Sequence, residues 1–378
     1  MRCEPSVPAE VLAAMRAPFA SAGAEVVDPP ILQPLGALLD LAGEALRARL
    51  FVVQAEGGAE ACLRPDFTVP VARLHLEHGG GEGRYYYEGR AFRAAPERSD
   101  RAEEFLQIGL EFYGAADGSV VEADAEIAAL AWRASTAGGR DDLVLWLGDV
   151  ALFAAFVDAL DLAPGLAARL KRAAARPRRM QAELDRAGAA APSAGGGQLA
   201  ATLAGLSEPE AEALLQEVWA LAGVERVGGR GAAEIAQRLI RRAEDARAPA
   251  LTEAEAEAVR RFLAVEAAPN EALAALGALA SAGGAFAEAL EDWRERLARL
   301  ASAGVPLEQA RFAARLGHTF DYYDGLTFEV RSRALGADRP VAVGGRYDGL
   351  SARLGGAAGA RAVGAMVRPW RAFAGGEA

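Results

Sequence analysis

Lysine, cysteine and histidine are scarce in this chain of 378 residues. Lys171 is the single lysine among 41 basic residues, and the chain has two cysteines and three histidines. Two cysteines do not make a disulfide framework, and neither has a neighbouring ligand at metal-binding spacing. His75 and His78 lie three residues apart, but zinc usually takes four ligands and no others surround them. No metal site is therefore expected.

Long apolar runs and an excess of positive charge are also absent. The N-terminal segment contains early Pro and Glu residues, so it predicts neither a signal peptide nor a membrane span, and a cytoplasmic protein is expected. The 41 basic and 52 acidic residues give a net charge of −11, which opposes a general nucleic-acid or membrane surface. The basic run at 171–179 is more typical of a solvated helix face than of an RNA or phosphate contact.

Glycine-rich stretches occur at 191–197 and 228–231. Neither stretch has the strand-loop-helix context of a phosphate-binding loop, so both are interpreted as linkers. No cofactor is expected.

The sequence pattern changes twice along the chain. A helix is predicted near residues 8–22, followed by short strands, and apolar residues at helical spacing then dominate residues 152–312. Strand patterns return after residue 312. The expected organisation is an α+β core formed by 1–151 and 313–378 and interrupted by a mainly helical insertion at 152–312. The predicted strands lie at 50–53, 84–87, 143–147, 325–331, 340–343 and 362–367.

Three segments combine strand spacing with polar side chains that a purely structural core would not need. They lie at 63–73 (LRPDFTVPVAR), 85–114 (YYYEGRAFRAAPERSDRAEEFLQIGLEFYG) and 320–353, which contains FDYYDGLTFEV and GGRYDGL. Buried charges require partners or ligands because unpaired burial is costly. These segments therefore hold the candidate binding residues.

The side chains in these segments suit a small zwitterion that carries a polar ring. Asp66, Gln107 and Glu111 offer oxygens to an ammonium group, whereas Tyr322 and Tyr323 offer hydroxyls and an aromatic wall.

Arg93 follows a predicted strand and has two interpretations that the residues alone leave open. Its guanidinium could clamp a carboxylate or phosphate in bidentate fashion, or it could form a structural salt bridge to Glu103 or Glu104.

These segments, in this order, resemble the catalytic core of class II histidyl-tRNA synthetase. LRPDFT resembles the Leu-Arg-Pro-Glu-Gly-Thr loop of that family, GRAFRAAPERSDRAEEFLQIGLE resembles its motif 2, and FDYYDGLTFE with GGRYDGL resembles its histidine-specific region. The segment DPPILQP at 28–34 resembles motif 1, which builds the synthetase dimer. The resemblance implies an antiparallel sheet core with helices, and a homodimer.

The resemblance also implies a histidine-binding pocket. The positions that match this pocket, with the motif 2 arginine beside them, are Asp66, Thr68, Arg93, Gln107, Glu111, Tyr322 and Tyr323. Asp66 replaces a glutamate and reaches one methylene less far towards the ammonium group.

Three departures fall where the synthetases handle ATP. Ala95 replaces the motif 2 glutamate that accepts the adenine amino group, and His318 replaces an arginine that faces the α-phosphate. Arg368 fills a glycine position of motif 3, where a side chain would crowd the nucleotide. Losing one electrostatic stabiliser alone can reduce a rate by ~100- to 1000-fold. The pocket is thus expected to be kept and amino-acid activation to be lost.

The chain ends at Ala378, seven residues after Arg371, so no C-terminal anticodon-binding domain is expected. Together these features resemble the regulatory subunit family of ATP phosphoribosyltransferase. That resemblance implies a non-catalytic subunit that forms a hetero-oligomer with a separate short-form catalytic subunit. This complex would carry out the first step of histidine biosynthesis, with L-histidine as the feedback effector.

Two alternatives stay open on the sequence. One is a histidine-activating, aminoacyl-adenylate-forming enzyme without an anticodon-binding domain, and the other is a binding module with neither partner. The sequence also leaves open whether histidine binds the inherited pocket or a subunit interface.

Overall fold

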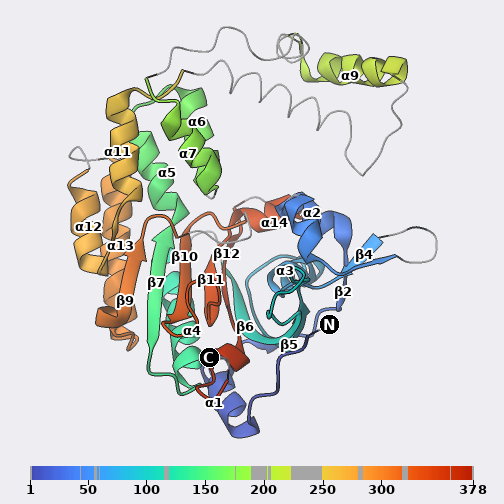
Figure 1. Cartoon of the computed structure of the whole chain (residues 1–378), viewed down its shortest axis with the longest axis vertical. Helices are drawn as coiled ribbons and strands as arrows, with labels where there is room; N and C mark the ends of the chain where they lie inside the picture. Colours follow the sequence, from blue (N-terminus) through green and yellow to red (C-terminus); the bar gives the residue numbers. More distant parts are fainter. Residues whose placement is uncertain are drawn as a thin grey trace. The chain divides into compact units, whose positions relative to one another are not determined.

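The computed structural model describes residues 2–42, 44–54, 58, 60–114, 119–174, 176–188, 202, 206–222, 249–279, 284–316, 322–357 and 359–376. The chain divides into two compact units, one formed by Met1–Ala155 with Phe262–Ala378 and the other by Phe156–Arg261. Figure 1 shows that the first unit is built around a large sheet with helices packed against it.

The large sheet of the first unit has nine strands in the order β1-β5-β6-β12-β11-β10-β7-β9-β8. Neighbouring strands are antiparallel except for the β1–β5 and β7–β9 pairs, which are parallel. This sheet confirms the predicted α+β class with an antiparallel core. The strands are β1 (Glu25–Val26), β5 (Gly83–Phe92), β6 (Glu104–Gly114), β7 (Leu143–Asp149), β8 (Glu266–Ala267), β9 (Ala310–Ala313), β10 (Leu326–Ser332), β11 (Ala342–Arg346) and β12 (Arg361–Val367).

A smaller sheet and short helices lie near the N-terminal part of the same unit. The small sheet has the order β2-β4-β3, with all strands antiparallel. An apolar cluster joins this region to β5 and β6 and includes side chains of α2 and α3. The elements are β2 (Leu32–Pro34), α2 (Leu35–Ala42), the 3-10 helix η1 (Glu44–Arg49), β3 (Val52–Gln54), β4 (Glu60–Leu63) and α3 (Thr68–Glu77).

Helix α4 (Val120–Thr136) packs against β6, β10, β11 and β12. Its N-cap is Ser119, whose side chain accepts a hydrogen bond of 3.2 Å from the backbone N–H of Glu122 and so satisfies one free donor of the first turn. Helices α1 (Ala9–Ala20) and α13 (Ala285–Ser302) pack against α4. The remaining elements of this unit are α12 (Pro269–Gly277), η2 (Leu307–Gln309), α14 (Gly349–Arg353) and α15 (Pro369–Ala372).

Strand β6 divides its side chains between the two faces of the sheet. Side chains alternate along a strand, so Phe105, Gln107 and Glu111 point to one face, and Ile108 and Leu110 point to the opposite face. All five side chains are buried. The β6 face that carries Glu111 also carries the candidate binding residues.

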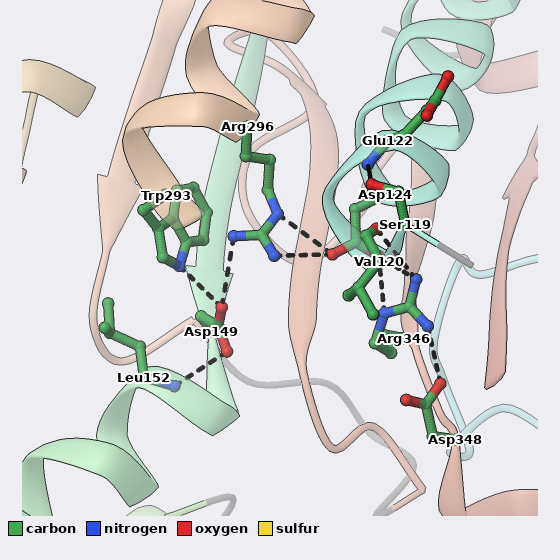
Figure 2. Close-up of polar contacts among 10 residues, drawn as sticks. All are labelled: Ser119, Val120, Glu122, Asp124, Asp149, Leu152, Trp293, Arg296, Arg346 and Asp348. Atoms are coloured by element: carbon green, nitrogen blue, oxygen red, sulfur yellow. Dashed lines mark hydrogen bonds and ion pairs between the residues drawn. The ribbon is translucent and has the colours of Figure 1, made fainter. Parts of the chain in front are cut away.

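A buried charge network ties α4 to α13 and to the sheet, as Figure 2 shows. Asp124 of α4 is fully buried and receives hydrogen bonds from Arg296 of α13 (2.9 Å) and from Arg346 of β11 (2.8 Å). Asp149, at the end of β7, accepts a bond of 2.7 Å from the Trp293 indole, and burial raises its pKa. Loss of one partner from such a network would leave an uncompensated buried charge, so these elements depend on one another.

The second unit, Phe156–Arg261, is helical in its described residues. It contains α6 (Pro164–Ala173), α7 (Pro177–Asp185) and α9 (Glu208–Ala222), while the unit boundaries fall within α5 (Val150–Ala159) and α11 (Glu253–Leu263). Thr252 and Glu255 exchange two hydrogen bonds in a capping box before α11. The predicted insertion spans 152–312, whereas the compact unit spans Phe156–Arg261, and β8, α12, α13 and β9 belong to the first unit.

Candidate ligand-binding site

A cavity of about 880 Å³ lies in the first unit, on the Glu111 face of the sheet. Its walls come from η1, from the start of α3, and from strands β5, β6, β10, β11 and β12. The structure brings together in these walls the predicted residues Asp66, Thr68, Arg93, Tyr322 and Tyr323, and also Ala95 and Arg368. His318 lies outside the described residues.

Asp66 presents an acceptor to the cavity just before α3 begins at Thr68. Its carboxylate is buried, and no described side chain donates a hydrogen bond to either oxygen. Burial raises the pKa of Asp66, while Arg93 and the backbone N–H groups of Val69 and Thr68 act in the opposite direction. A buried carboxylate to which no side chain donates suits a cationic ligand.

Two tyrosines form an aromatic wall of the cavity. The rings of Tyr322 and Tyr323 lie 4.7 Å apart, and the ring of Tyr347 meets Tyr322 edge-on at 5.7 Å. Burial raises the pKa of both Tyr322 and Tyr323, so these hydroxyls stay neutral and can donate hydrogen bonds. The wall can therefore cover a small planar group.

Glu111 lies below the cavity wall and is already held by hydroxyl groups. One carboxylate oxygen accepts from Thr68 (2.9 Å) and Tyr87 (3.3 Å), and the other accepts from Tyr347. Burial raises the pKa of Glu111 to about 8, against the hydrogen bonds from Tyr347 and Thr68. Glu111 thereby orients Thr68 and Tyr87, both of which reach the cavity.

Gln107 is fully buried but does not belong to the cavity wall. Both polar atoms of its side chain lack a hydrogen-bond partner among the described residues. Of the predicted pocket residues, Gln107 and Glu111 are the two that the cavity surface leaves out.

Gly364 of β12 is paired with Glu111 of the neighbouring strand β6, and its lack of a side chain allows the Glu111 carboxylate to approach closely. A Cβ atom at position 364 would lie 1.5 Å from Oε2 of Glu111 and 2.6 Å from the Tyr347 hydroxyl. No side chain fits there unless the carboxylate moves. The glycine is thus required by the position of Glu111.

Two positions that depart from the synthetase pattern, Ala95 and Arg368, line the end of the cavity away from the two tyrosines. Ala95 offers no hydrogen-bonding side chain, and Arg368 covers the ring of Phe105 with its guanidinium 3.6 Å from the ring centroid. Arg368 is buried and pairs with the carboxylate of Glu4. Burial, followed by the charge of Arg371, lowers the pKa of Arg368 to about 9, while Glu4 acts to raise it.

Arg93 lies near both Asp66 and Phe105, with its guanidinium carbon 5.5 Å from the centroid of the Phe105 ring. Its Nε donates a hydrogen bond of 2.8 Å to the Pro65 carbonyl, and its charge acts on Asp66. Glu104, one of its predicted alternative partners, forms an ion pair with Arg90 at 3.7 Å.

The sequence interpretation missed four side chains that shape this site: Glu4, Arg49, Arg331 and Tyr347. Tyr347 falls within the GGRYDGL segment, so its neighbourhood was singled out although the residue was not. Arg49 and Arg331 do not stand out from the many other arginines of the sequence. No sequence pattern indicates that Glu4 pairs with Arg368.

His75 is part of the core beneath this region. Its ring stacks on Tyr113 with 3.8 Å between centroids, and Nδ1 lies 3.1 Å from the Tyr85 hydroxyl. Within the described residues, no group of three or more His, Cys, Asp or Glu side chains could hold a metal ion. None of the helices in the described part of the chain has the length and apolar character needed to cross a bilayer.

This architecture is similar to that of known proteins. The family model for histidyl-tRNA synthetase matches residues 6–250 and 213–369. A Bacillus halodurans structure described as an ATP phosphoribosyltransferase regulatory subunit/histidyl-tRNA synthetase has a TM-score of 0.62 at 22% identity, covering 95% of this chain and 76% of that one. Histidyl-tRNA synthetase from Nostoc sp. PCC 7120 has a TM-score of 0.61 at 15% identity, covering 97% and 74%. The fold is that of the class II histidyl-tRNA synthetases.

Relatives with higher sequence identity indicate one family within this fold class. ATP phosphoribosyltransferase regulatory subunits from Mesorhizobium japonicum and Agrobacterium fabrum are each 37% identical, with 89% of both chains covered in each comparison. The corresponding subunit of Brucella anthropi is 34% identical over 91% of both chains. The chain therefore belongs to the family of ATP phosphoribosyltransferase regulatory subunits.

Proposed function

We propose that this chain is the non-catalytic, regulatory subunit of an ATP phosphoribosyltransferase. It acts in the cytoplasm with a separate short-form catalytic subunit, in the first step of L-histidine biosynthesis. The observation that carries this proposal is the 34–37% identity to regulatory subunits over about nine-tenths of both chains. The catalytic subunit would join ATP to phosphoribosyl pyrophosphate, and this chain would stabilise its active arrangement.

The effector proposed for the cavity is L-histidine. Asp66 supplies a buried carboxylate to which no described side chain donates a hydrogen bond, which suits the α-ammonium group. Thr68 adds a hydroxyl, and Tyr322 and Tyr323 form a wall for the imidazole ring. Arg93, which also lines the cavity, suits the carboxylate of the amino acid.

In this arrangement Glu111 and Gln107 support the pocket from beneath. Both oxygens of Glu111 are occupied by the hydroxyl groups of Thr68, Tyr87 and Tyr347. Glu111 therefore positions Thr68 for the ligand. Feedback inhibition then means that bound histidine favours the inactive arrangement of the complex, with reciprocal coupling between histidine and substrate affinity.

An adenylate-forming enzyme is the competing function, and the ATP-side residues count against it. Ala95 lacks an acceptor for an adenine amino group, and Arg368 occupies the face of Phe105. The chain alone should give no histidine-dependent exchange of pyrophosphate into ATP. Robust exchange would favour the enzyme.

The deciding experiment mixes the purified chain with the cognate short-form catalytic subunit and measures complex formation, activity and histidine inhibition. Complex formation and activation are expected, together with inhibition by histidine. If the two chains neither associate nor give an active enzyme, the regulatory role is wrong. The chain would then be a binding module that has no catalytic partner.

The Asp66→Asn variant tests the proposed effector site separately. Losing one charge-assisted hydrogen bond should raise the histidine concentration needed for half-inhibition at least about tenfold, with complex formation and uninhibited activity preserved. Asp141→Asn changes an exposed carboxylate outside the cavity and serves as the matched control. Unchanged inhibition in the Asp66 variant would place the histidine sensor elsewhere, such as a subunit interface.

A homodimeric core is part of the proposal. The five large apolar side chains that are exposed among the described residues all fall within residues 26–53, and we call them the apolar edge: Val26, Ile31, Leu32, Val52 and Val53. Exposed apolar groups of this kind are typical of protein contacts. A second copy of the chain would cover them.

A further inference from the structure

Positive charge is concentrated in the walls of the cavity. Three carboxylates are found there, from Asp66, Glu329 and Asp338, against six arginine guanidinium groups. These arginines are Arg49, Arg93, Arg101, Arg331, Arg368 and Arg371. The chain as a whole has a net charge of −11, so this local excess opposes the overall composition.

Several of these arginines already have acidic partners. Arg331 pairs with Glu329 at 2.6 Å, Arg101 pairs with Asp338 at 3.5 Å, and Arg368 pairs with Glu4. Asp66 lies close enough to Arg93 for the two charges to interact. Each of the three acidic side chains of the cavity therefore already interacts with a particular arginine.

Arg49 lies in the same walls without such a partner. Among the described residues no carboxylate forms an ion pair with Arg49, and its charge is opposed by those of Arg93 and Arg101. Burial and these two like charges lower its pKa. An anion in this part of the cavity would relieve the repulsion, because guanidinium groups bind phosphate oxygens through paired N–H donors.

The same end of the cavity is unsuited to a purine. A nucleotide base binds most readily by stacking on a flat aromatic face, and one face of the Phe105 ring is covered by the guanidinium of Arg368. Arg368 is held there by Glu4, whose backbone N–H donates 2.9 Å to the carbonyl of Glu104 on β6. The N-terminal segment therefore fixes the arginine over the ring.

We propose that the arginine end of this cavity binds a compact phosphate-bearing anion and does not bind a nucleotide base. Arg49 and Arg101 hold the phosphate oxygens next to the positive charge of Arg93, and Arg368, held by Glu4, covers the Phe105 ring against a purine. The inference does not depend on the catalytic partner or on histidine. It can be tested on the chain alone.

The test is calorimetric titration of the full chain with inorganic pyrophosphate at low ionic strength. We expect saturable binding that weakens as salt is added, because added ions screen the charges. Arg49→Gln should weaken binding about tenfold or more, since a hydrogen bond to a charged group is lost. Arg47→Gln is the matched control, because Arg47 lies on the same 3-10 helix, pairs with Glu60 and does not line the cavity.

Two further ligands test the exclusion of a base. Adenosine should not displace pyrophosphate, and ATP should bind no more tightly than inorganic tripolyphosphate. Displacement by adenosine, or a clear preference for ATP, would overturn the proposal in favour of a nucleotide site.

Absence of pyrophosphate binding to the folded chain would overturn it outright, as would equal weakening by Arg47→Gln and Arg49→Gln. Circular dichroism of each variant establishes that it is folded. Loss of histidine inhibition in the reconstituted complex is a separate readout, so failure here and failure of the proposed function are distinguishable.

Discussion

The hydroxyl of Thr68 donates a hydrogen bond of 2.9 Å to the buried carboxylate of Glu111. Thr68 begins α3 and Glu111 lies in the middle of β6, so this bond joins the loop that carries Asp66 to the central sheet. Tyr87 and Tyr347 donate to the same carboxylate. The geometry of the proposed histidine pocket therefore depends on one buried acid that does not reach the cavity surface itself.

This acid should make folding stability depend on pH. The pKa of Glu111 is raised by burial from 4.5 to about 8, so between these values the folded chain holds a proton that the unfolded chain releases. The contribution of Glu111 to stability is fully present below pH 4.5 and is lost as the pH rises towards 8. Between pH 5.5 and 8.5 the wild-type chain should lose about 3 kcal/mol more unfolding free energy than Glu111→Gln.

Urea denaturation at the two pH values measures this difference. Glu82→Gln, which changes an exposed carboxylate, should keep the wild-type pH dependence. A pH slope that is the same in Glu111→Gln and in wild type would show that the acid is ionised throughout.

A methyl group at Gly364 should disturb the pocket from the sheet side. Its Cβ would lie 1.5 Å from Oε2 of Glu111, so the carboxylate must move and its hydrogen bonds to Thr68 and Tyr347 must weaken. Gly364→Ala should cost about 1–3 kcal/mol of unfolding free energy and weaken histidine binding. Chemical denaturation and calorimetry with histidine measure the two effects.

Gly114→Ala is the control for this variant. Gly114 lies at the end of β6 and a Cβ atom there meets nothing within 4 Å. Equal stability of the two alanine variants would refute the close packing at Gly364.

Much of the fold could be predicted because its signals are local. The strands predicted at 84–87, 143–147, 325–331, 340–343 and 362–367 follow from side-chain spacing, and the structure confirms them as parts of β5, β7, β10, β11 and β12. The exception is the stretch after Phe262, where β8 and β9 join the sheet although the sequence pattern is helical. These strands have two and four residues, too few to show a strand period.

The site was less accessible from the sequence. Asp66, Thr68, Tyr322 and Tyr323 could be named because they lie in recognisable segments. The pair of Arg368 with Glu4 spans 364 positions of the chain, and no spacing rule connects such residues. The hydrogen bonds from hydroxyl groups to Glu111 also depend on side-chain geometry. The spacing of residues in the sequence does not reveal that geometry.

The buried network around Asp124 makes the strongest stability prediction. Asp124→Asn removes the charge that pairs with both Arg296 and Arg346 and leaves two buried cations under-compensated. Breaking a buried ion pair costs about 3–5 kcal/mol, so the variant should unfold at much lower urea concentration than wild type. Glu122→Gln, two positions away on the exposed surface of α4, should change stability by less than about 0.5 kcal/mol. Similar midpoints for both variants would contradict the network's role.

A charge on the apolar edge should separate the proposed dimer. Leu32 of β2 is exposed in the single chain, so Leu32→Glu should leave the fold intact but place a carboxylate against the apolar surface of a second copy. Sedimentation velocity at micromolar concentration should show dimers for wild type and monomers for the variant, with unchanged circular dichroism. Ala298→Glu adds the same charge to an exposed position of α13 and should stay dimeric. A monomeric wild-type chain, or a Leu32→Glu variant that stays dimeric, would remove residues 26–53 from the interface.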